Sequence, residues 1–394
     1  MRLLTRYVLV ELLKVFLLAL TALTALIIIG GVVREAVVQS LPPAQVIWLI
    51  PYILPDALRI SIPVTLLLAA TTVYSRMSGS NEVVAIKAVG ISPWVIVWPT
   101  LFVACLISFV TVWLNDLAVS WGRNGAQRVV IESVEEIAYS MLRTQKRYSS
   151  PSFAINVRQV QGRKLIGPTV SLHAGSNSPA ITIRAEEAEL HCDHREEVLR
   201  ITLRNGTFDV EGNVSGRFPD EREYEVPLNR ASRSTASPSA SWLPLRRIPE
   251  ETAKQQQIVE KLEEEMAAGA AYQMLRGDFD GLTSREWTSR EARLTTERGQ
   301  LCRLWTEPYR RWSAGFSCLC FVWVGVPMAI WLRNRDFLTS FFLCFVPILI
   351  VYYPLMIYGV DGAKGGTIPP YAVWAGNVIL AIWGAYLLRK VLRY

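Results

Sequence analysis

Six long apolar stretches, three on each side of the polar block 116–311, constrain the fold of this chain more than any other feature. About 20 apolar residues are needed to cross about 30 Å of hydrocarbon, and each stretch is long enough to do so. Lipid offers no hydrogen-bond partners to the backbone, so each spanning stretch must be helical. A hydrophobic content of 51% agrees, because it is high for a soluble chain.

Windows without charged residues set the expected spans. They are Val15–Val33, Ile60–Ser75 with an extension through Pro51–Leu58, and windows within Ala88–Asn115, Trp312–Leu332, Phe337–Val360 and Gly365–Leu388. We therefore expect an α-helical membrane protein with three transmembrane helices in residues 1–115 and three more in residues 312–394. A cleaved signal peptide is the alternative for the first stretch. The stretch is too long for that, and Val33-Arg34-Glu35 is no small-residue cleavage site.

The short loops between the spans predict the orientation, because Lys and Arg gather on the cytoplasmic side. With a cytoplasmic N-terminus, the inside segments carry Arg2, Arg6, Lys14, Arg76, Lys87, Arg333, Arg335, Arg389, Lys390 and Arg393. The outside segments carry Arg34, Arg59 and Lys364. Both termini are therefore expected in the cytoplasm and the block 116–311 outside, in the periplasm of a bacterium. The same bias explains the net charge of +7, so it does not indicate a nucleic-acid partner.

The block 116–311 combines a strand region with a helical region. From about 150 to 230, apolar and polar residues alternate, which is typical of half-buried strands. Asn205-Gly206 lies between two such runs and predicts a hairpin turn, because both residues tolerate positive φ. We expect an antiparallel sandwich or roll here, then a flexible linker over 232–241. Residues 250–305 are expected to form two charged helices, Glu250–Leu275 and Thr283–Trp305.

Motifs of catalysis are missing from the sequence. It contains no HExxH, GxSxG or GxxxxGK[ST] pattern, and its histidines (His173, His191, His194) all lie in the strand region. In the run His191–His194, neighbouring side chains of a strand would face opposite sides, which argues against a metal site. We therefore expect no catalytic residue, no metal and no cofactor. A disulfide between Cys192 and Cys302 is left open.

The segment 76–92 between the second and third spans is the most informative short stretch. Val83, Ile86 and Val89 recur at helical spacing, and Gly90 offers a stop signal. A short helix with one apolar face, held at the membrane surface by two spans, suits a groove on a cytosolic partner. A connector that merely lies on the membrane surface is the alternative.

Several residues carry a resemblance to a known family. Ser75-Arg76-Met77, Asn81-Glu82-Val83, Ala85 and Gly90-Ile91-Ser92 resemble the coupling-helix signature of the LptF/LptG lipopolysaccharide export permeases, also called the YjgP/YjgQ family. Further similar residues are Arg6-Tyr7, Glu11, Ile62-Pro63, Glu307, Arg310, Arg311, Gly325-Val326-Pro327, Ile368-Pro369-Pro370, Trp374 and Asn377. The spacing from Gly362 to Asn377 favours the F-type permease over the G-type.

The resemblance implies a non-catalytic permease subunit of an ABC transporter in the inner membrane, which acts in outer-membrane biogenesis. Its implied partners are a second permease of the family in a heterodimer, a cytosolic ATPase dimer of LptB type, a periplasmic LptC-type jellyroll protein, and lipopolysaccharide. The strand region would be a periplasmic β-jellyroll. The ATPase would grip a coupling helix within 76–92, for which the expected residues are Arg76, Ser80, Glu82, Val83, Ile86, Lys87 and Gly90.

Cationic side chains at the periplasmic ends of the spans are expected to meet the phosphates of lipid A. The candidates are Arg34, Arg59 and Arg311, and the alternative for each is an ordinary arginine that reaches to the membrane interface. An alternative function for the whole chain is that of a membrane-anchored periplasmic signal or mechanotransmission protein without lipid transport.

Overall fold

The chain forms two compact units in a computed structural model. The structure describes residues 2–39, 43–123, 125, 138–139, 141–143, 146–149, 153–172, 181–193, 198–210, 214–227, 239–277, 279–280, 284–332 and 337–393. The helical unit consists of Met1–Ile27, Leu54–Gly122 and Ser239–Tyr394, and the sheet unit consists of Ile28–Ile53 and Arg123–Pro238.

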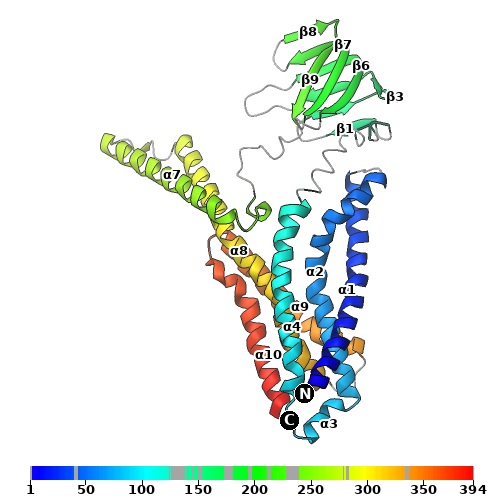
Figure 1. Cartoon of the computed structure of the whole chain (residues 1–394). Coiled ribbons are helices and arrows are strands. Elements are labelled where there is room, and N and C mark those ends of the chain that lie inside the picture. Colours follow the sequence, from blue (N-terminus) through cyan, green and yellow to red (C-terminus); the bar gives the residue numbers. More distant parts are fainter. Residues whose placement is uncertain are drawn as a thin grey trace. The chain divides into compact units, whose positions relative to one another are not determined.

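Six of the described helices are long and apolar enough to cross a membrane (Figure 1). They are α1 (Arg2–Gln39), α2 (Pro43–Gly79), α4 (Trp94–Leu117), α8 (Arg285–Trp331), α9 (Phe337–Lys364) and α10 (Ala375–Arg393). A π-helix, η1 (Ala118–Arg123), continues α4, and a 3-10 helix, η5 (Pro370–Trp374), precedes α10. The prediction of six membrane-spanning helices is thereby confirmed.

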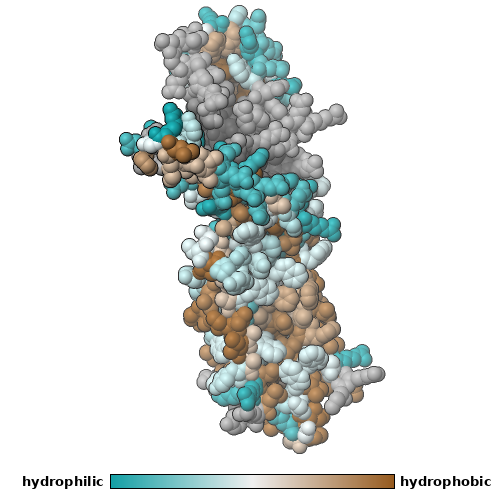
Figure 2. Space-filling view, turned by 90° about the vertical axis from the view of Figure 1, so that its left-hand side faces the viewer, coloured by the Kyte–Doolittle hydropathy of each residue, from teal (hydrophilic) through white to brown (hydrophobic). Residues whose placement is uncertain are grey.

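The core of the helical unit joins α2, α4 and α8. Leu66 and Ala70 of α2 pack in one buried cluster with Ile96 of α4 and Val322 of α8. Small residues let the helices approach closely, as helix packing in lipid requires. At Gly315, for example, a Cβ atom would lie 2.3 Å from Cγ2 of Val112. On the face shown in Figure 2, hydrophobic residues gather over the middle of this unit.

The helix α8 runs for 47 residues without interruption. The prediction of a charged helix that ends at Trp305, separate from a span that begins near Trp312, is therefore wrong. Polarity changes along α8, but no helix-ending glycine marks the change, and Pro308 is accommodated inside the helix. The other charged helix, α7 (Ile248–Arg276), agrees with the expected Glu250–Leu275.

Helix α7 and the charged first half of α8 pack against each other as a helical hairpin outside the apolar windows. The side chain of Gln255 on α7 is buried and donates to Oε2 of Glu297 on α8 at 2.6 Å. Arg298 of α8 donates from both Nε and Nη2 to Oε1 of Glu263 on α7. Hydrophilic residues cover much of this part of the chain in Figure 2.

The sheet unit contains a nine-stranded antiparallel sheet that curls around a core of its own. Its strands are β1 (Arg147–Ser149), β2 (Phe153–Asn156), β3 (Gln159–Gln161), β4 (Lys164–Ile166), β5 (Thr169–Leu172), β6 (Ile181–Asp193), β7 (Val198–Val210), β8 (Val214–Phe218) and β9 (Arg222–Pro227). The predicted antiparallel β insert between the two groups of spans is confirmed.

The long central strands β6 and β7 bend at facing positions, which curls the sheet. One half of β6 pairs with β5 and the other with β4, while the halves of β7 pair with β8 and β9. Ile201 and Leu203 are buried before the bend in β7, but Gly206 is the buried residue after it. The alternation of buried and exposed residues thus shifts by one position at the bend, so the same face of the curled sheet remains buried on both sides of it.

The bend in β7 falls at Asn205-Gly206, so the predicted hairpin turn there is wrong. Asn205 adopts a φ of 49°, as the prediction assumed, yet the chain continues along the same strand. Its Nδ2 atom donates to Oε2 of Glu186 on β6 at 3.2 Å. The tolerance of Asn for positive φ serves a local bend here instead of a chain reversal.

Most of the expected linker 232–241 lies outside the described residues, and so do His173 and His194. Its last residues belong to a 3-10 turn, η3 (Ala240–Trp242), in which Ala240 is buried. Residues 243–247 connect this turn to α7.

Candidate functional sites at the two ends of the helical unit

The segment 76–92, which we call the coupling segment, contains a short helix between two sharp turns. Asn81, the residue before α3 (Glu82–Ala88), has a φ of 61°. Gly90, two residues after the end of α3, has a φ of 82°. The backbone N–H of Gly90 donates to Lys87 and that of Ile91 to Ile86. These two bonds form a Schellman cap, which needs a left-handed residue and so favours glycine. The helix is shorter than the segment 76–92 in which it was expected.

The two sides of α3 differ in their surroundings. Val83 is only 4% exposed and packs, with Ile86, in the main core of the helical unit. Val84 is 43% exposed and Val89, just beyond the helix, is 77% exposed. Glu82 is half-buried, and its Oε1 accepts a bond from Ser80 Oγ at 2.9 Å. One side of α3 therefore packs against the membrane helices, and the other side is exposed.

Side chains of the coupling segment and of the end of α2 reach three other membrane helices. Arg76, in the last turn of α2, donates from Nη1 to Glu11 Oε1 on α1 at 2.8 Å. Ser78 Oγ donates to the carbonyl of Ile330 on α8 at 2.9 Å. Lys87 Nζ donates to the carbonyl of Val391 on α10 at 2.8 Å. Lys87 therefore links α3 directly to α10, while Arg76 and Ser78 link the end of α2 to α1 and α8.

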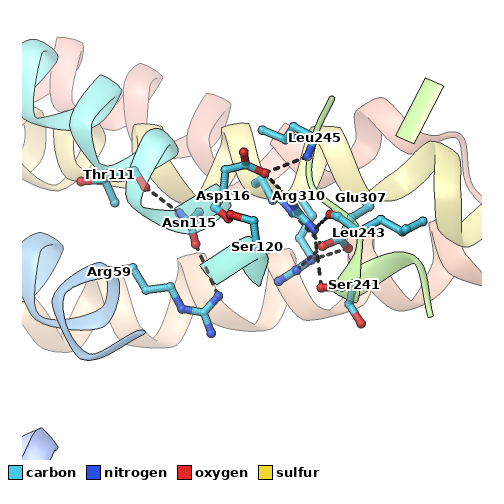
Figure 3. Close-up of polar contacts among 11 residues, drawn as sticks. Arg59, Thr111, Asn115, Asp116, Ser120, Ser241, Leu243, Leu245, Glu307 and Arg310 are labelled. Carbon is cyan, nitrogen blue, oxygen red and sulfur yellow. Dashed lines mark hydrogen bonds and ion pairs between the residues drawn. The ribbon is translucent and has the colours of Figure 1, made fainter. Parts of the chain in front are cut away.

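At the other end of the spans lies a polar network that includes Asp116 of α4 and Glu307 and Arg310 of α8 (Figure 3). Arg311 of α8 makes the largest number of its bonds. Its Nη1 atom donates to Oδ1 of Asp116 on α4 at 3.0 Å, and its Nε atom donates to Oε1 of Glu307 at 3.0 Å. Its Nη2 atom donates to the carbonyl of Leu243 at 2.7 Å. Asp116 Oδ1 also accepts from the backbone N–H of Leu245 at 2.7 Å.

The charges of this network balance. Glu307 also accepts from Arg310 Nε at 2.9 Å, so two guanidinium groups face two carboxylates. Arg311 and Glu307 are each 1% exposed. Burying charges is costly unless each is paired and hydrogen-bonded, and here each is. The network ties the end of α4 to α8 and to the segment that precedes α7.

The predicted phosphate-binding arginines differ in their placement. Arg59 of α2 pairs with Asp56 at 2.6 Å between Nη2 and Oδ1, and its Nη1 lies 3.5 Å from Oδ1 of Asn115. Arg59 and Arg311 therefore contact consecutive residues of α4, Asn115 and Asp116. Arg34 is exposed and belongs to the sheet unit.

Sequence reasoning missed the two acidic partners, Asp116 and Glu307, as members of a site. Asp116 and Arg311 are 195 residues apart in sequence, so spacing could not bring them together. The available signal was that both carboxylates flank apolar windows at the level of the arginines. A charge at such a position needs a partner nearby.

Within the described ranges, no group of three or more His, Cys, Asp and Glu side chains could hold a metal ion. Cys302 carries a free thiol. The side chain of Cys192, its possible disulfide partner, lies outside what the structure describes.

Comparison with known protein families places the chain in one of them. Residues 6–390 match the family described as "Lipopolysaccharide export system permease LptF/LptG". No curated protein matches the chain.

Proposed function

Because this match spans nearly the whole chain, the protein belongs to the LptF/LptG family of lipopolysaccharide export system permeases, and we propose that it is one membrane subunit of an ATP-driven transporter. Such a subunit extracts lipopolysaccharide from the inner membrane. In this proposal the chain catalyses nothing itself. A second permease of the family completes a heterodimer, and a cytosolic ATPase dimer of LptB type hydrolyses ATP. The spacing from Gly362 to Asn377 favours the F-type permease over the G-type.

The proposed orientation has both termini and the coupling segment in the cytoplasm. The excess of Lys and Arg in the loops on that side supports it, because such loops are retained in the cytoplasm. The coupling segment then faces the ATPase, and the sheet unit lies in the periplasm.

The observation that carries the proposal is that one side of α3 packs against the spans while the other side is exposed. Val83 and Lys87 hold the helix to the spans, while Val84 and Val89 remain exposed for a partner. A short helix of this kind suits a groove on the ATPase. Closure of the ATPase dimer would push α3, and the bonds of Arg76 and Ser78 would pass the movement to α1 and α8.

Lipopolysaccharide would be handled at the opposite end of the spans. At about 1.5 Å per residue, residues 94–116 of α4 rise about 33 Å, which is close to the thickness of the hydrocarbon. Arg34 and Arg59 are the proposed contacts for the lipid A phosphates. Arg311 stays a prediction, and its four internal bonds count against a role in binding phosphate. The lipid would then pass along the sheet unit to an LptC-type jellyroll protein.

Crosslinking tests the coupling role directly. A photoreactive side chain at Val89, in the chain expressed with its second permease and the ATPase, should give an adduct with the ATPase. The same side chain at Leu3, which is 85% exposed on α1, serves as the control and should give little adduct. Glu82→Arg should reduce the amount of ATPase that copurifies. Equal adducts at both positions, or full copurification with Glu82→Arg, would contradict the proposal and favour a membrane-anchored signalling protein.

A further inference from the structure

A groove of about 760 Å³ opens between α3 and the ends of α8 and α10. On α3 it is lined by Val83, Val84, Lys87 and Ala88, and Val89 is not among its lining residues. Val83, Ile330 and Val391 give it apolar walls, while Lys87 and Lys390 place two ammonium groups along it. The proposed function gives roles to Val84 and Lys87 at its edge, but it assigns no ligand to the space between α3, α8 and α10.

The two lysines lack acidic partners among the described residues. Lys87 Nζ donates to the carbonyl of Val391 at 2.8 Å, which occupies one of its three donors. Lys390 Nζ lies 4.7 Å from the ring centroid of Trp331, a cation–π contact. Neither contact neutralises the charge, so two positive charges share one groove. A ligand that fits it carries negative charge.

The rest of the lining indicates what else such a ligand carries. Ile330 and Trp331 end the apolar run of α8, and Val391 lies in the last turn of α10. Trp331 is 57% exposed, and exposed tryptophans at the ends of spans lie at the interface between lipid and water. A ligand at this level has an anionic head at the lysines and apolar chains that continue into the hydrocarbon.

We propose that this groove binds the phosphodiester headgroup of an anionic phospholipid from the leaflet at the coupling segment. Lys87 and Lys390 contact the phosphate, and the acyl chains leave between α8 and α10. Basic pockets between membrane helices are suited to such headgroups. A soluble phosphate would satisfy the lysines equally well but would leave the apolar walls in contact with water. The bound lipid therefore joins α3 to α10, beside the bond from Lys87 to Val391.

Native mass spectrometry of the full chain tests the proposal. The detergent-solubilised protein is given equal amounts of phosphatidylglycerol and phosphatidylcholine with identical acyl chains, and the retained lipids are counted. Wild type should retain phosphatidylglycerol preferentially. Lys390→Gln and Lys87→Gln should each lower that retention about fivefold, as expected for the loss of one surface cation near a lipid phosphate. Lys390→Arg should keep it.

Arg389→Gln is the matched control, because it removes the same charge from an exposed neighbour that does not line the groove. It should leave retention of phosphatidylglycerol unchanged. Equal retention of the two lipids, or an equal loss in Arg389→Gln, would overturn the proposal. Displacement of the lipid by excess inorganic phosphate would also overturn it, because the ligand would then be a soluble anion. Lys390→Gln suffices if Lys87→Gln fails to fold, since Lys390 is exposed.

Discussion

The guanidinium of Arg311 lies 3.0 Å from the carboxylate of Asp116, measured from Nη1 to Oδ1, across 195 residues of sequence. This pair joins α4, after which the chain leaves the spans, to α8, through which it returns. Asp116 also accepts from Leu245, in the segment that leads into α7. The pair therefore joins the apolar stretches of α4 and α8 to the segment that leads into α7.

Loss of Arg311 should destabilise the helical unit strongly. Arg311→Gln removes the guanidinium that pairs with Asp116 and leaves the buried Glu307 with Arg310 alone, and breaking a buried pair in this way costs about 3–5 kcal/mol. The midpoint of thermal unfolding, followed by tryptophan fluorescence in detergent, should fall clearly. Arg303→Gln, on the exposed side of the same helix, is the control and should change little. Equal midpoints for the two variants would show that the network does not stabilise the fold.

Two glycines of α8 should respond oppositely to the same substitution. At Gly315 a Cβ atom would meet Val112 at 2.3 Å and the backbone of α4 at 3.0 Å, so Gly315→Ala should cost about 1–3 kcal/mol. At Gly299 nothing lies within 4 Å, so Gly299→Ala should stabilise the helix by about 1 kcal/mol. Thermal unfolding of both variants measures the difference. A stabilising effect of Gly315→Ala would disprove the close packing of α4 and α8.

The cap of α3 should matter for coupling. Gly90→Ala forces a residue with a side chain to a φ of 82°, which costs about 1–2 kcal/mol and loosens the end of α3. Gly79→Ala is the control, because Gly79 ends α2 with open space around it. ATP hydrolysis by the complete transporter, measured with and without lipopolysaccharide, should lose its stimulation in Gly90→Ala and keep it in Gly79→Ala. A normal response in Gly90→Ala would argue against α3 as the coupling element.

The bend in β7 should tolerate glycine but not valine at position 205. Both Asn205→Gly and Asn205→Val remove the bond from Nδ2 to Glu186, so the comparison isolates the backbone conformation. Asn205→Val should weaken the sheet by about 1–2 kcal/mol more, because a β-branched residue disfavours a φ of 49°. Hydrogen exchange of the β7 amides in the full chain measures this loss of protection. Equal protection in the two variants would contradict a role for positive φ in the bend.

The membrane helices could be predicted from sequence because the need for an apolar helix applies to each span separately, within about 20 consecutive residues. A span must be apolar and helical over its whole length, so a window such as Phe337–Val360 carries the signal by itself. The alternation in β6 and β7 was readable for the same reason. The extent of α8 could not be predicted from the sequence, because a change in polarity marks where a helix enters lipid and not where the helix ends.

The candidate sites were harder to predict, because they depend on contacts distant in sequence. Gly90 was predictable as a helix stop, since its cap is formed by residues next to it. The bond from Lys87 to Val391 spans 304 residues, and nothing near Lys87 indicates it. Likewise, Asn205-Gly206 reveals positive φ but not whether the chain turns back, because neighbouring strands decide that.

The central claim is that movement of α3 drives lipopolysaccharide out of the membrane, and extraction per ATP hydrolysed tests it most directly. The complete transporter is reconstituted in vesicles containing lipopolysaccharide, and transfer to a soluble LptC-type acceptor is measured together with phosphate release. With Glu82→Arg, we expect transfer per ATP to fall severalfold, while Arg389→Gln should leave it unchanged. Undiminished transfer per ATP with Glu82→Arg would contradict the account.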